Sequence, residues 1–414
     1  MGQLLIMKYK VALIADNHFL FTPEGNVYVN GTYTKQYLSR FTSNFDSLIV
    51  IARGRQVEHS DDLSKYRESG GSNVCFRFVD DFQGVQSYLF NRRRISKQIQ
   101  KGIADVDAIF VRMPCILTTL SLKLANKAKM PVCIDVGADP ETIYLGSNKT
   151  IFRKLLSRYL MNVCKRSCLQ ANGVSYVTHS ILQNKYPCKA ILEGESTRFF
   201  TASISNVDIS RGFYYRRSYH NDYDLVKLLH ISNNIPINSS KGHQESLFVL
   251  KRLQEKGCNA KLTFLGDGEG ITELKELASE LGVLNSVDFK GRVADRVEYR
   301  NYLLGNDIFL FPSHSEGLPR VILEAMATGM ACVSSNVDGI PEILDADDIF
   351  NYSDIEGMSN RIIQLLSDSN ELNKVSLRNY VTAQNYSYEK IKINVDNYFG
   401  KLKALIDNRK RSNP

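Results

Sequence analysis

The sequence lacks a run of about 18 apolar residues, the length that a helix needs to cross a bilayer. It also lacks a low-complexity tract, and its 43% hydrophobic and 23% charged residues are ordinary for a folded protein. The short apolar start merges into a predicted strand and has no small-residue cleavage site. These absences predict a cytoplasmic chain that is folded throughout.

The sequence also lacks a CxxC pair, although it has eight cysteines. Cys164 and Cys168 form the only close pair, and they would lie on one helix face. We therefore expect reduced, mostly buried thiols. The formal charge of +8 favours an anionic partner, such as a nucleoside diphosphate, an acidic membrane surface or nucleic acid, and does not choose among them.

Strand-like runs alternate with helix-length amphipathic stretches, and no short-period repeat interrupts them, which predicts parallel sheets with helical crossovers. A length of 414 residues also favours about two or three domains. The first series has strands at Tyr9–Asp16, Ser47–Arg53, Ala108–Met113, Val132–Val136 and Val174–Thr178. The second has strands at Leu225–Ser232, Lys261–Asp267, Ser286–Gly291, Asp307–Ser313 and Ala331–Ser335.

A polar, tyrosine-rich segment at residues 200–222 separates the two series, and it reads as a connection or an edge strand. The chain then ends with a long amphipathic helix from Tyr388 to Ile406. We predict an α/β fold of two Rossmann-like domains that face a central cleft. The first covers residues 1–205 and the second 206–385, and residues 386–414 form a helix that returns toward the first domain.

The segment that begins at Phe311 reads FPSHSEGLPRVILEAMATGMACVSSNVDGIPEIL, with a strand end, a polar loop, a helix and another strand. A helix N-terminus offers unpaired N–H groups and about half a positive charge, which suits a diphosphate. Glu316 and Glu324 would lie roughly 12 Å apart in a helix, so a ligand that bridges them is long. A nucleoside diphosphate sugar has hydroxyls for a carboxylate at both ends. By itself, this spacing is more typical of a capping acid at Glu316 and an exposed helix residue at Glu324.

The whole string EGLPRVILEAMATG, with FPS before it and ACVSS and GIPE after it, resembles the donor-binding signature of the retaining glycosyltransferases of family 4. The resemblance covers most of residues 224–352 and implies the two-domain fold called GT-B. It implies that Glu316 faces the donor sugar and Glu324 the ribose. It also implies that the amides of Gly317 and Leu318 bind the diphosphate, with Ser313 beside them.

The string SSKGHQ places Lys241 just before a helix, where this family keeps a lysine on the diphosphate. A cation there would stabilise the leaving group, and a solvated loop lysine is the alternative. The family usually has an arginine about five residues earlier, and HISNNIPINSSKG has none. We therefore expect Arg292 or Arg320 to share the diphosphate.

Two further patterns in the second domain admit other interpretations. GDGEG places Gly266 and Gly268 after a strand, where glycine allows close approach to a ligand, and with Asp288 it also fits a dinucleotide site. The family instead places a loop like FKGRV beside the nucleobase. DADD at residues 345–348 contains D-x-D, a metal-binding pattern of a different transferase fold, and here a solvated acidic loop is the preferred interpretation.

In the first domain, strand one is predicted to end at Asp16, and a loop with Gly25 and Gly31 follows. This arrangement resembles the glycine-bearing first loop of the family, which passes near the donor phosphate and the acceptor. Asp16, His18 and Gly31 are accordingly predicted to lie on the acceptor side. A lone loop histidine such as His18 is also typical of a structural or solvated residue.

Many members of the family have a histidine after a middle strand of this domain, and CIDVGADPETIY has none. Asp139 is the candidate catalytic residue there, because it lies beyond the strand end and before Pro140. The string VSYVTHSILQNKYP resembles bacterial surface-polysaccharide transferases of the family and includes His179, a second candidate.

The stretch NKTIFRKLLSRYLMNVCKR is basic and amphipathic, which favours a helix on an anionic membrane surface. An ordinary helix packed on the sheet is the alternative. Its basic residues are Lys149, Arg153, Lys154, Arg158, Lys165 and Arg166, and its apolar residues are Ile151, Phe152, Leu155, Leu156, Tyr159, Leu160 and Val163. Arg92–Arg94 are interpreted as a solvated face that would add to the same basic patch.

These patterns together predict a retaining glycosyltransferase of the hexosyltransferase type, peripheral on the inner face of the membrane. It would move a sugar from a nucleoside diphosphate sugar to a lipid-linked saccharide acceptor in bacterial capsule or lipopolysaccharide synthesis, with no cofactor and no metal. A nucleotide-sugar epimerase or phosphorylase on the same scaffold is one alternative. A non-enzymatic nucleotide- or nucleic-acid-binding protein is another, but an aromatic and basic recognition motif is missing, so no nucleic acid partner is predicted.

Overall fold

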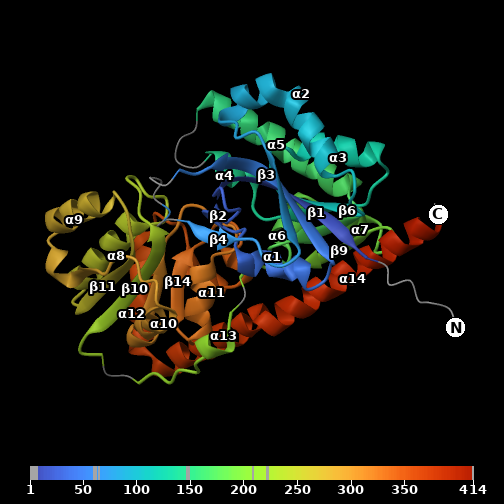
Figure 1. Ribbon diagram of the computed structural model, residues 1–414. Coiled ribbons are helices and arrows are strands. Elements are labelled where there is room, and N and C mark those ends of the chain that lie inside the picture. Colours follow the sequence, from blue (N-terminus) through green and yellow to red (C-terminus); the bar gives the residue numbers. More distant parts are fainter. Residues whose placement is uncertain are drawn as a thin grey trace.

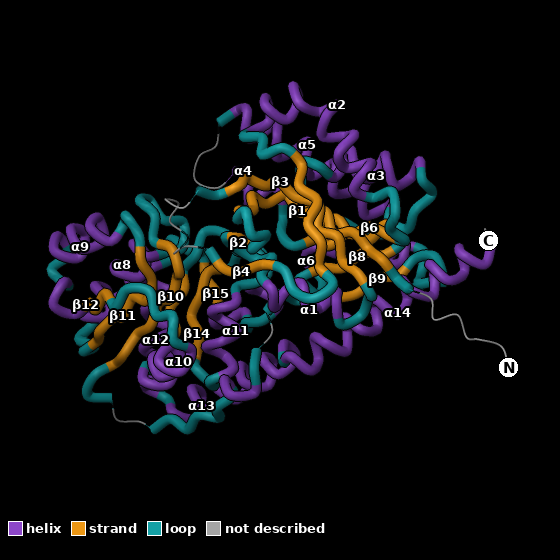
Figure 2. Tube along the Cα trace, viewed as in Figure 1, coloured by secondary structure: helices purple, strands orange, loops and turns teal. Residues whose placement is uncertain are grey.

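The computed structural model describes residues 8–58, 63, 66–145, 150–207, 209–220 and 223–412. It forms two α/β lobes, each with helices packed around a mainly parallel sheet (Figure 1). A long C-terminal helix leaves the second lobe and runs along the first (Figure 2). The prediction of two Rossmann-like domains is confirmed.

The sheet of the first lobe has the order β5-β3-β1-β6-β7-β8-β9, with parallel neighbours, and β2 and β4 add an antiparallel extension beside β1. Its strands are β1 Lys10–Phe21, β2 Val27–Val29, β3 Ser47–Gln56, β4 Arg67–Ser69, β5 Val74–Val79, β6 Ala108–Met113, β7 Val132–Val136, β8 Gly173–Tyr176 and β9 Phe200–Ser203. Its helices are α1 Lys35–Thr42, α2 Gly84–Gly102, α3 Thr118–Lys127, α4 Pro140–Leu145, α5 Ile151–Gln170, α6 Ile181–Lys185 and α7 Lys189–Leu192.

The sheet of the second lobe is parallel, with the order β12-β11-β10-β13-β14-β15. Its strands are β10 Val226–Asn234, β11 Ala260–Asp267, β12 Val287–Phe289, β13 Ile308–Phe311, β14 Ala331–Ser335 and β15 Ile349–Phe350. Its helices are α8 His243–Glu255, α9 Ile271–Glu280, α10 Arg296–Gly305, α11 Arg320–Ala327, α12 Ile355–Ser367 and α13 Ser369–Ala383. Short 3-10 turns occur at Ile340–Glu342 (η3) and Gln384–Tyr386 (η5).

The central strands of both sheets are runs of apolar residues because helices cover both of their faces. In β13, all residues from Ile308 to Phe311 are buried, and β14 is buried from Ala331 to Ser335. Each sheet separates two apolar clusters, one on either face. The polar residues that follow these strands therefore gather at the carboxyl edge of each sheet.

The C-terminal helix α14, Tyr388–Ser412, belongs to the second lobe in sequence and to the first in packing. Its buried residues recur at helical spacing and join the core under the first sheet. The ring of Phe399 lies 4.9 Å from that of Phe45 and 5.4 Å from that of Phe110, measured between centroids. The predicted return of the helix to the first domain is confirmed.

The chain crosses between the lobes twice, and the two crossings lie side by side. Ile209 and Ser387 form a parallel bridge, and the N–H of Ile209 donates to the carbonyl of Tyr386 at 3.1 Å. The N–H of Tyr388 donates back to the carbonyl of Ile209 at 3.2 Å. The domain boundaries at residues 205 and 385 stay predictions, and both fall close to this paired crossing.

The prediction that strand one ends at Asp16 is wrong, because β1 continues to Phe21. A register shift between Ala15 and His18 bends the strand, and its second half pairs with both β3 and the antiparallel strand β2. The segment predicted as a glycine-bearing loop is therefore largely a β-hairpin. Residues Phe200–Ser203 form the edge strand β9, one of the two predicted interpretations.

Two smaller expectations concern thiols and membrane spans. The cysteines are unpaired, and all except Cys75 and Cys258 are buried. Across the described residues, no helix combines the length and the apolar character needed to cross a membrane.

Candidate active site

The predicted donor loop, residues 312–319, follows the buried end of β13 and leads into α11. Its first anchor is Ser313, which is fully buried and whose hydroxyl lies 3.0 Å from Oε1 of Glu316 and 3.3 Å from the carbonyl of Ser240. Pro319 occupies the N-cap position of α11. The loop thus holds Glu316 at the carboxyl edge of the second sheet, as the sequence predicts.

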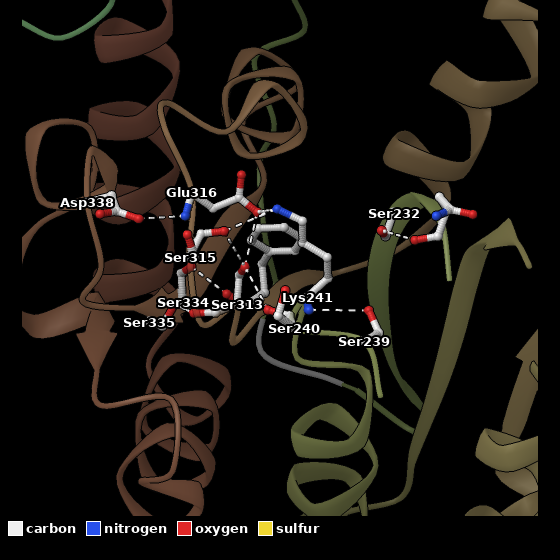
Figure 3. Close-up of polar contacts among 12 residues, drawn as sticks. Ser232, Ser239, Ser240, Lys241, Ser313, Ser315, Glu316, Ser334, Ser335 and Asp338 are labelled. Carbon is white, nitrogen blue, oxygen red and sulfur yellow. Dashed lines mark hydrogen bonds and ion pairs between the residues drawn. The ribbon is translucent and has the colours of Figure 1, made fainter. Parts of the chain in front are cut away.

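Glu316 and Lys241 come from different loops and form an ion pair (Figure 3). The Nζ of Lys241 donates to Oε1 of Glu316 at 2.6 Å and to the carbonyl of Ser315 at 3.1 Å. The side chain of Glu316 is 12% exposed and that of Lys241 35% exposed. An anionic ligand can therefore reach the ammonium group while the carboxylate stays fixed beside it.

The loop of Lys241 can approach the donor loop only because Gly242 follows it. Gly242 has a φ of 79°, and a Cβ there would lie 2.1 Å from the carbonyl oxygen of Pro312. A side chain would thus push the two loops apart. The N–H of His314 donates to the carbonyl of Ser240 at 2.8 Å and closes the same contact.

Asp338 supports the donor loop from the far side, and the sequence reasoning did not identify it. Its Oδ2 accepts the N–H of Glu316 at 2.7 Å (Figure 3), and the N–H of Gly339 donates to the carbonyl of Gly317 at 2.9 Å. Burial, with the nearby charges of Asp139 and Glu316, raises the pKa of Asp338 to about 6. The Asp-Gly pair in NVDGIPE is typical of a turn and was the available signal.

Glu324 lies within α11 and is 3% exposed, so the alternative of an exposed helix residue is wrong. Its Oε1 lies 3.0 Å from both Nη2 of Arg296 and Nε of Arg320, and its Oε2 accepts the hydroxyl of Tyr299 at 2.6 Å. Burial and the carboxylate of Glu324 raise the pKa of Tyr299. Arg320 is thus at the Glu324 end of the site, and its predicted role on the diphosphate stays a prediction.

The remaining donor-side residues border this region. Gly266 and Gly268 have φ values of 145° and 154°, and a Cβ at either would meet backbone of residues 232–236, at 1.7 Å from the Ser232 oxygen and 2.4 Å from the Ile235 oxygen. These glycines therefore permit close packing of two loops. Arg292 is exposed in the loop after β12. Their contact with a ligand stays a prediction.

The two sheets meet at their carboxyl edges, where the donor loop touches the loop after β7. A Cβ on Gly317 would lie 3.4 Å from the carbonyl oxygen of Gly137. Asp139, two residues on, accepts the N–H of Glu141 at 2.9 Å, the ammonium group of Lys185 and the hydroxyl of Tyr186. Asp139 thus lies at the interface of the lobes with structural partners, and its catalytic role stays a prediction.

The acceptor-side residues gather around the bend of β1. Asp16 forms an ion pair with Arg53 at 2.8 Å and accepts the N–H of Ile116 at 3.0 Å. His18 forms an ion pair with Asp81 through Nδ1, and Gly31 lies near Asn17. The structure therefore brings Asp16, His18 and Gly31 to one end of the first sheet, and it binds Asp16 to the scaffold.

A cavity of about 480 Å³ opens beside these residues, at the ends of β1, β3 and β5 and along α2. Aromatic side chains and planar polar side chains line it, among them Phe21, Phe78, Phe82, Asp80, Asp81, Asn91, Arg94 and Gln98. Sequence reasoning missed it because β5 was not predicted and its wall comes from four separate segments. Its size lies within the usual range of small-molecule sites.

The interpretation of DADD as a solvated acidic loop is wrong for Asp348, which is fully buried between Arg361 and Arg378. Asp345 caps the turn at Ala346–Asp348 and pairs with Arg378 at 3.1 Å. This part of the motif therefore stabilises the lobe. Among the described residues, no group of three or more His, Cys, Asp or Glu side chains is arranged to hold a metal ion.

Comparison with known proteins relates the part of the chain that holds this site to a family. Residues 236–381, which hold the Lys241–Glu316 pair, match the family described as glycosyl transferases group 1. The chain therefore contains a group 1 glycosyltransferase domain. Protein CapJ of Staphylococcus aureus is 26% identical over 383 residues, which are 91% of each chain.

Solved structures show the same fold, called GT-B, over the whole chain. The lipopolysaccharide outer core galactosyltransferase WaaB superposes with a TM-score of 0.64 at 14% identity and covers 97% of this chain and 99% of its own. Anabaena HepE, solved in complex with UDP and glucose, gives a TM-score of 0.62 at 13% identity and covers 96% and 99%. The predicted fold and enzyme class of this glycosyltransferase are confirmed.

Proposed function

We propose that this glycosyltransferase binds a nucleoside diphosphate sugar between the Lys241–Glu316 pair and Glu324 and transfers the sugar with retained configuration. The observation that supports the donor site is the ion pair itself: a half-exposed cation and a largely buried carboxylate from separate loops meet at the carboxyl edge of the sheet. Glu316 would accept a hydrogen bond from a sugar hydroxyl, and Glu324 one from the ribose after a shift of Arg296 or Arg320.

In the proposed reaction the bond between the anomeric carbon and the diphosphate oxygen breaks, and a bond from that carbon to the acceptor oxygen forms. The proton of the acceptor hydroxyl passes to the leaving diphosphate oxygen. Lys241 and the amides of Gly317 and Leu318 would stabilise the charge that develops on the diphosphate. A metal is therefore not required by the proposal, and activity that persists in excess EDTA is the expected result.

The acceptor is proposed to be a saccharide whose distal part occupies the cavity along α2. Its lining pairs aromatic faces with planar hydrogen-bonding groups, a combination that suits sugar rings and their hydroxyls. The cavity lies about 20 Å from the loop after β7, since β5 and β7 are separated by four strand spacings of about 4.8 Å. An acceptor that reaches both places would have several sugar units.

A lipid-linked acceptor is proposed because an apolar and basic surface adjoins this cavity. On α5, Ile151, Phe152, Leu155 and Tyr159 are 78%, 65%, 61% and 55% exposed, while Leu160, Cys164 and Cys168 pack on the lobe. On α2, Phe90 is 90% exposed and Leu89 58% exposed. One face of α5 packs on the lobe, as the second interpretation of this helix predicts, and its exposed apolar face supports the proposed membrane contact. Lys149 lies outside the described residues.

This surface, the membrane patch, consists of Leu89, Phe90, Ile151, Phe152, Leu155 and Tyr159 with the exposed cations Arg92, Arg93, Arg153, Lys154 and Arg158. Burial raises the pKa of Tyr88 on α2, and Tyr159 on α5 is close enough to contribute, in agreement with the neighbouring positions of the two helices in Figure 1. Each basic residue near an anionic leaflet contributes about 1 kcal/mol. We propose peripheral binding to the inner face of the cell membrane. The resemblance of residues 174–187 to bacterial surface-polysaccharide transferases supports a role in surface polysaccharide synthesis.

A thermal-shift panel of nucleotide sugars tests the donor proposal first, since a ligand at 100 times its dissociation constant stabilises by about 2.7 kcal/mol. On the donor so found, Glu316→Gln and Lys241→Ala are expected to lower kcat by about 100-fold or more, because both act on charge that develops in the transition state. Glu276→Gln, on the exposed face of α9, is the matched control.

Three outcomes would contradict the proposal. Wild-type turnover by Glu316→Gln on the true substrates would remove this carboxylate from the donor site. Donor that is consumed with no acceptor product, and recovered as an isomer, would favour the epimerase alternative. Salt-dependent oligonucleotide binding without nucleoside diphosphate affinity would favour a nucleic-acid-binding protein.

A further inference from the structure

Glu342, in the 3-10 turn η3 of the second lobe, reaches across to the first lobe. Its Oε2 accepts the N–H of His179 at 2.6 Å, and its Oε1 accepts the N–H groups of Ser180 and Ile181 at 2.8 and 2.6 Å. The hydroxyl of Ser180 donates to Oε1 at 2.9 Å. One carboxylate thus receives four charge-assisted hydrogen bonds from three consecutive residues of the other lobe.

The turn that bears Glu342 starts directly behind the donor loop. Asp338 accepts the N–H of Glu316 at 2.7 Å, and the N–H of Gly339 donates to the carbonyl of Gly317 at 2.9 Å. A Cβ on Gly339 would lie 2.3 Å from that carbonyl oxygen, so no larger residue permits this approach. The five residues 338–342 therefore tie the donor loop to the first lobe.

The first-lobe end of this connection leads back to the donor loop by a second route. The residues that bind Glu342 open α6, whose Lys185 pairs with Asp139 and, at 2.6 Å, with Glu141. Asp139 belongs to the same loop as Gly137, whose carbonyl oxygen faces Gly317. These contacts form a ring: they lead from the donor loop through Glu342 and α6 to the loop after β7, which contacts the donor loop again at Gly317.

This ring of contacts lies beside the paired crossing between the lobes. The ring of His179 lies 5.8 Å from that of Tyr386 in η5, measured between centroids. Burial, with a smaller contribution from the nearby carboxylate of Glu342, raises the pKa of Tyr386, so this carboxylate and the crossing are close neighbours. A change at Glu342 would therefore act where the angle between the lobes is set.

We infer that Glu342 is a positioning residue that holds the acceptor-side lobe against the donor loop, so that one short turn sets both the loop geometry and the closure of the lobes. The inference rests on the proposed donor site at Glu316 and Lys241. It assigns no contact with substrate to Glu342. Its effect passes through Gly317 on one side and residues 179–181 on the other.

The test compares Glu342→Gln with Glu389→Gln, a control at the crossing that loses an ion pair with Arg211 and leaves the donor loop untouched. An amide nitrogen cannot accept the N–H groups of residues 179–181, so Glu342→Gln is expected to open the lobes. With UDP or GDP as the probe, the nucleotide dissociation constant should stay at the wild-type value. The radius of gyration of the nucleotide-bound protein, from small-angle X-ray scattering, should rise.

On the donor from the thermal-shift panel, kcat of Glu342→Gln should fall by about 10- to 100-fold, the range expected when reacting groups are misplaced by about 1 Å. Glu342→Asp, which keeps the charge, should recover part of the loss. Ser180→Ala, on the other lobe, should show a smaller loss in the same direction, and it decides the matter if Glu342→Gln does not fold.

Wild-type turnover and scattering in Glu342→Gln, or in Ser180→Ala when it is the deciding variant, would overturn the inference. A loss of nucleotide affinity equal to the loss of kcat would also overturn it, because the residue would then act on the donor loop alone. If no nucleotide sugar is turned over by the wild type, the proposed function fails, while the scattering comparison still tests the closure.

Discussion

At the scale of single residues, the second lobe combines a partly exposed ion pair at the donor site with a buried polar side chain behind it. Lys241 is half-exposed beside the buried carboxylate of Glu316. Directly behind it, His243 opens α8, is fully buried, and both of its ring nitrogens are without a hydrogen-bond partner. Such a group is tolerated only when neutral, because burial and a helix N-terminus both disfavour the imidazolium.

The burial of His243 predicts that the folded protein loses stability in acid. Burial and the charge of Lys241 lower the pKa of His243 from 6.5 to about 4 in the folded protein. Between these values the unfolded chain binds a proton that the folded chain does not. The stability that His243 provides is therefore complete above pH 6.5 and is lost as the pH falls toward 4.

The expected loss is about 3 kcal/mol of unfolding free energy between pH 7 and pH 4. Replacing His243 with Phe should remove this part of the pH dependence, which urea unfolding at several pH values measures. His220, exposed on the same lobe, provides the control His220→Phe. Equal slopes for wild type and His243→Phe would contradict the account.

At the scale of elements, the membrane patch on α2 and α5 gives the clearest prediction. The double variant Phe152→Glu with Leu155→Glu should weaken binding to vesicles of phosphatidylglycerol and phosphatidylcholine by about tenfold or more, since it removes apolar contact and adds two negative charges. The fold should be unaffected, because both side chains are more than half exposed. Vesicle sedimentation measures the change.

The control places the same change on another face. Val381 of α13 is 52% exposed, and Val381→Glu should leave vesicle binding unchanged. If both variants bind vesicles as the wild type does, the patch is not a membrane surface. Binding that is equally strong to vesicles of phosphatidylcholine alone would also contradict the proposed role of the basic residues.

Elements also show what the sequence could and could not predict. Strands β6 and β7 coincide with their predicted bounds, because apolar runs buried on both faces are unambiguous. β5 was missed, since Val74–Val79 is an edge strand with mostly half-exposed side chains. The donor loop was predicted because its residues are contiguous, whereas the contact of Glu342 with residues 179–181 joins segments about 160 positions apart in sequence, which no local pattern records.

At the scale of the whole molecule, α14 makes the two lobes one structure, because the first lobe completes its core with residues from the end of the chain. Phe399 and Tyr398 pack under β6 and β9 with Phe110 and Phe200. The hydrophobic core of the first lobe is therefore incomplete without α14. The donor loop makes its contacts within the second lobe and with the loop after β7, so its structure does not depend on that helix.

This dependence predicts an uneven effect of Phe399→Ala. The variant leaves a cavity among aromatic rings, so the first lobe should lose about 3–5 kcal/mol of stability. Amides of β6 and α1 should exchange hydrogen faster, while those of β13 and the affinity for UDP or GDP stay as in the wild type. Ile393→Ala, on the same helix but 58% exposed, is the control and should change neither. Uniformly faster exchange in both lobes would contradict this prediction, because it would show that the lobes unfold as one unit.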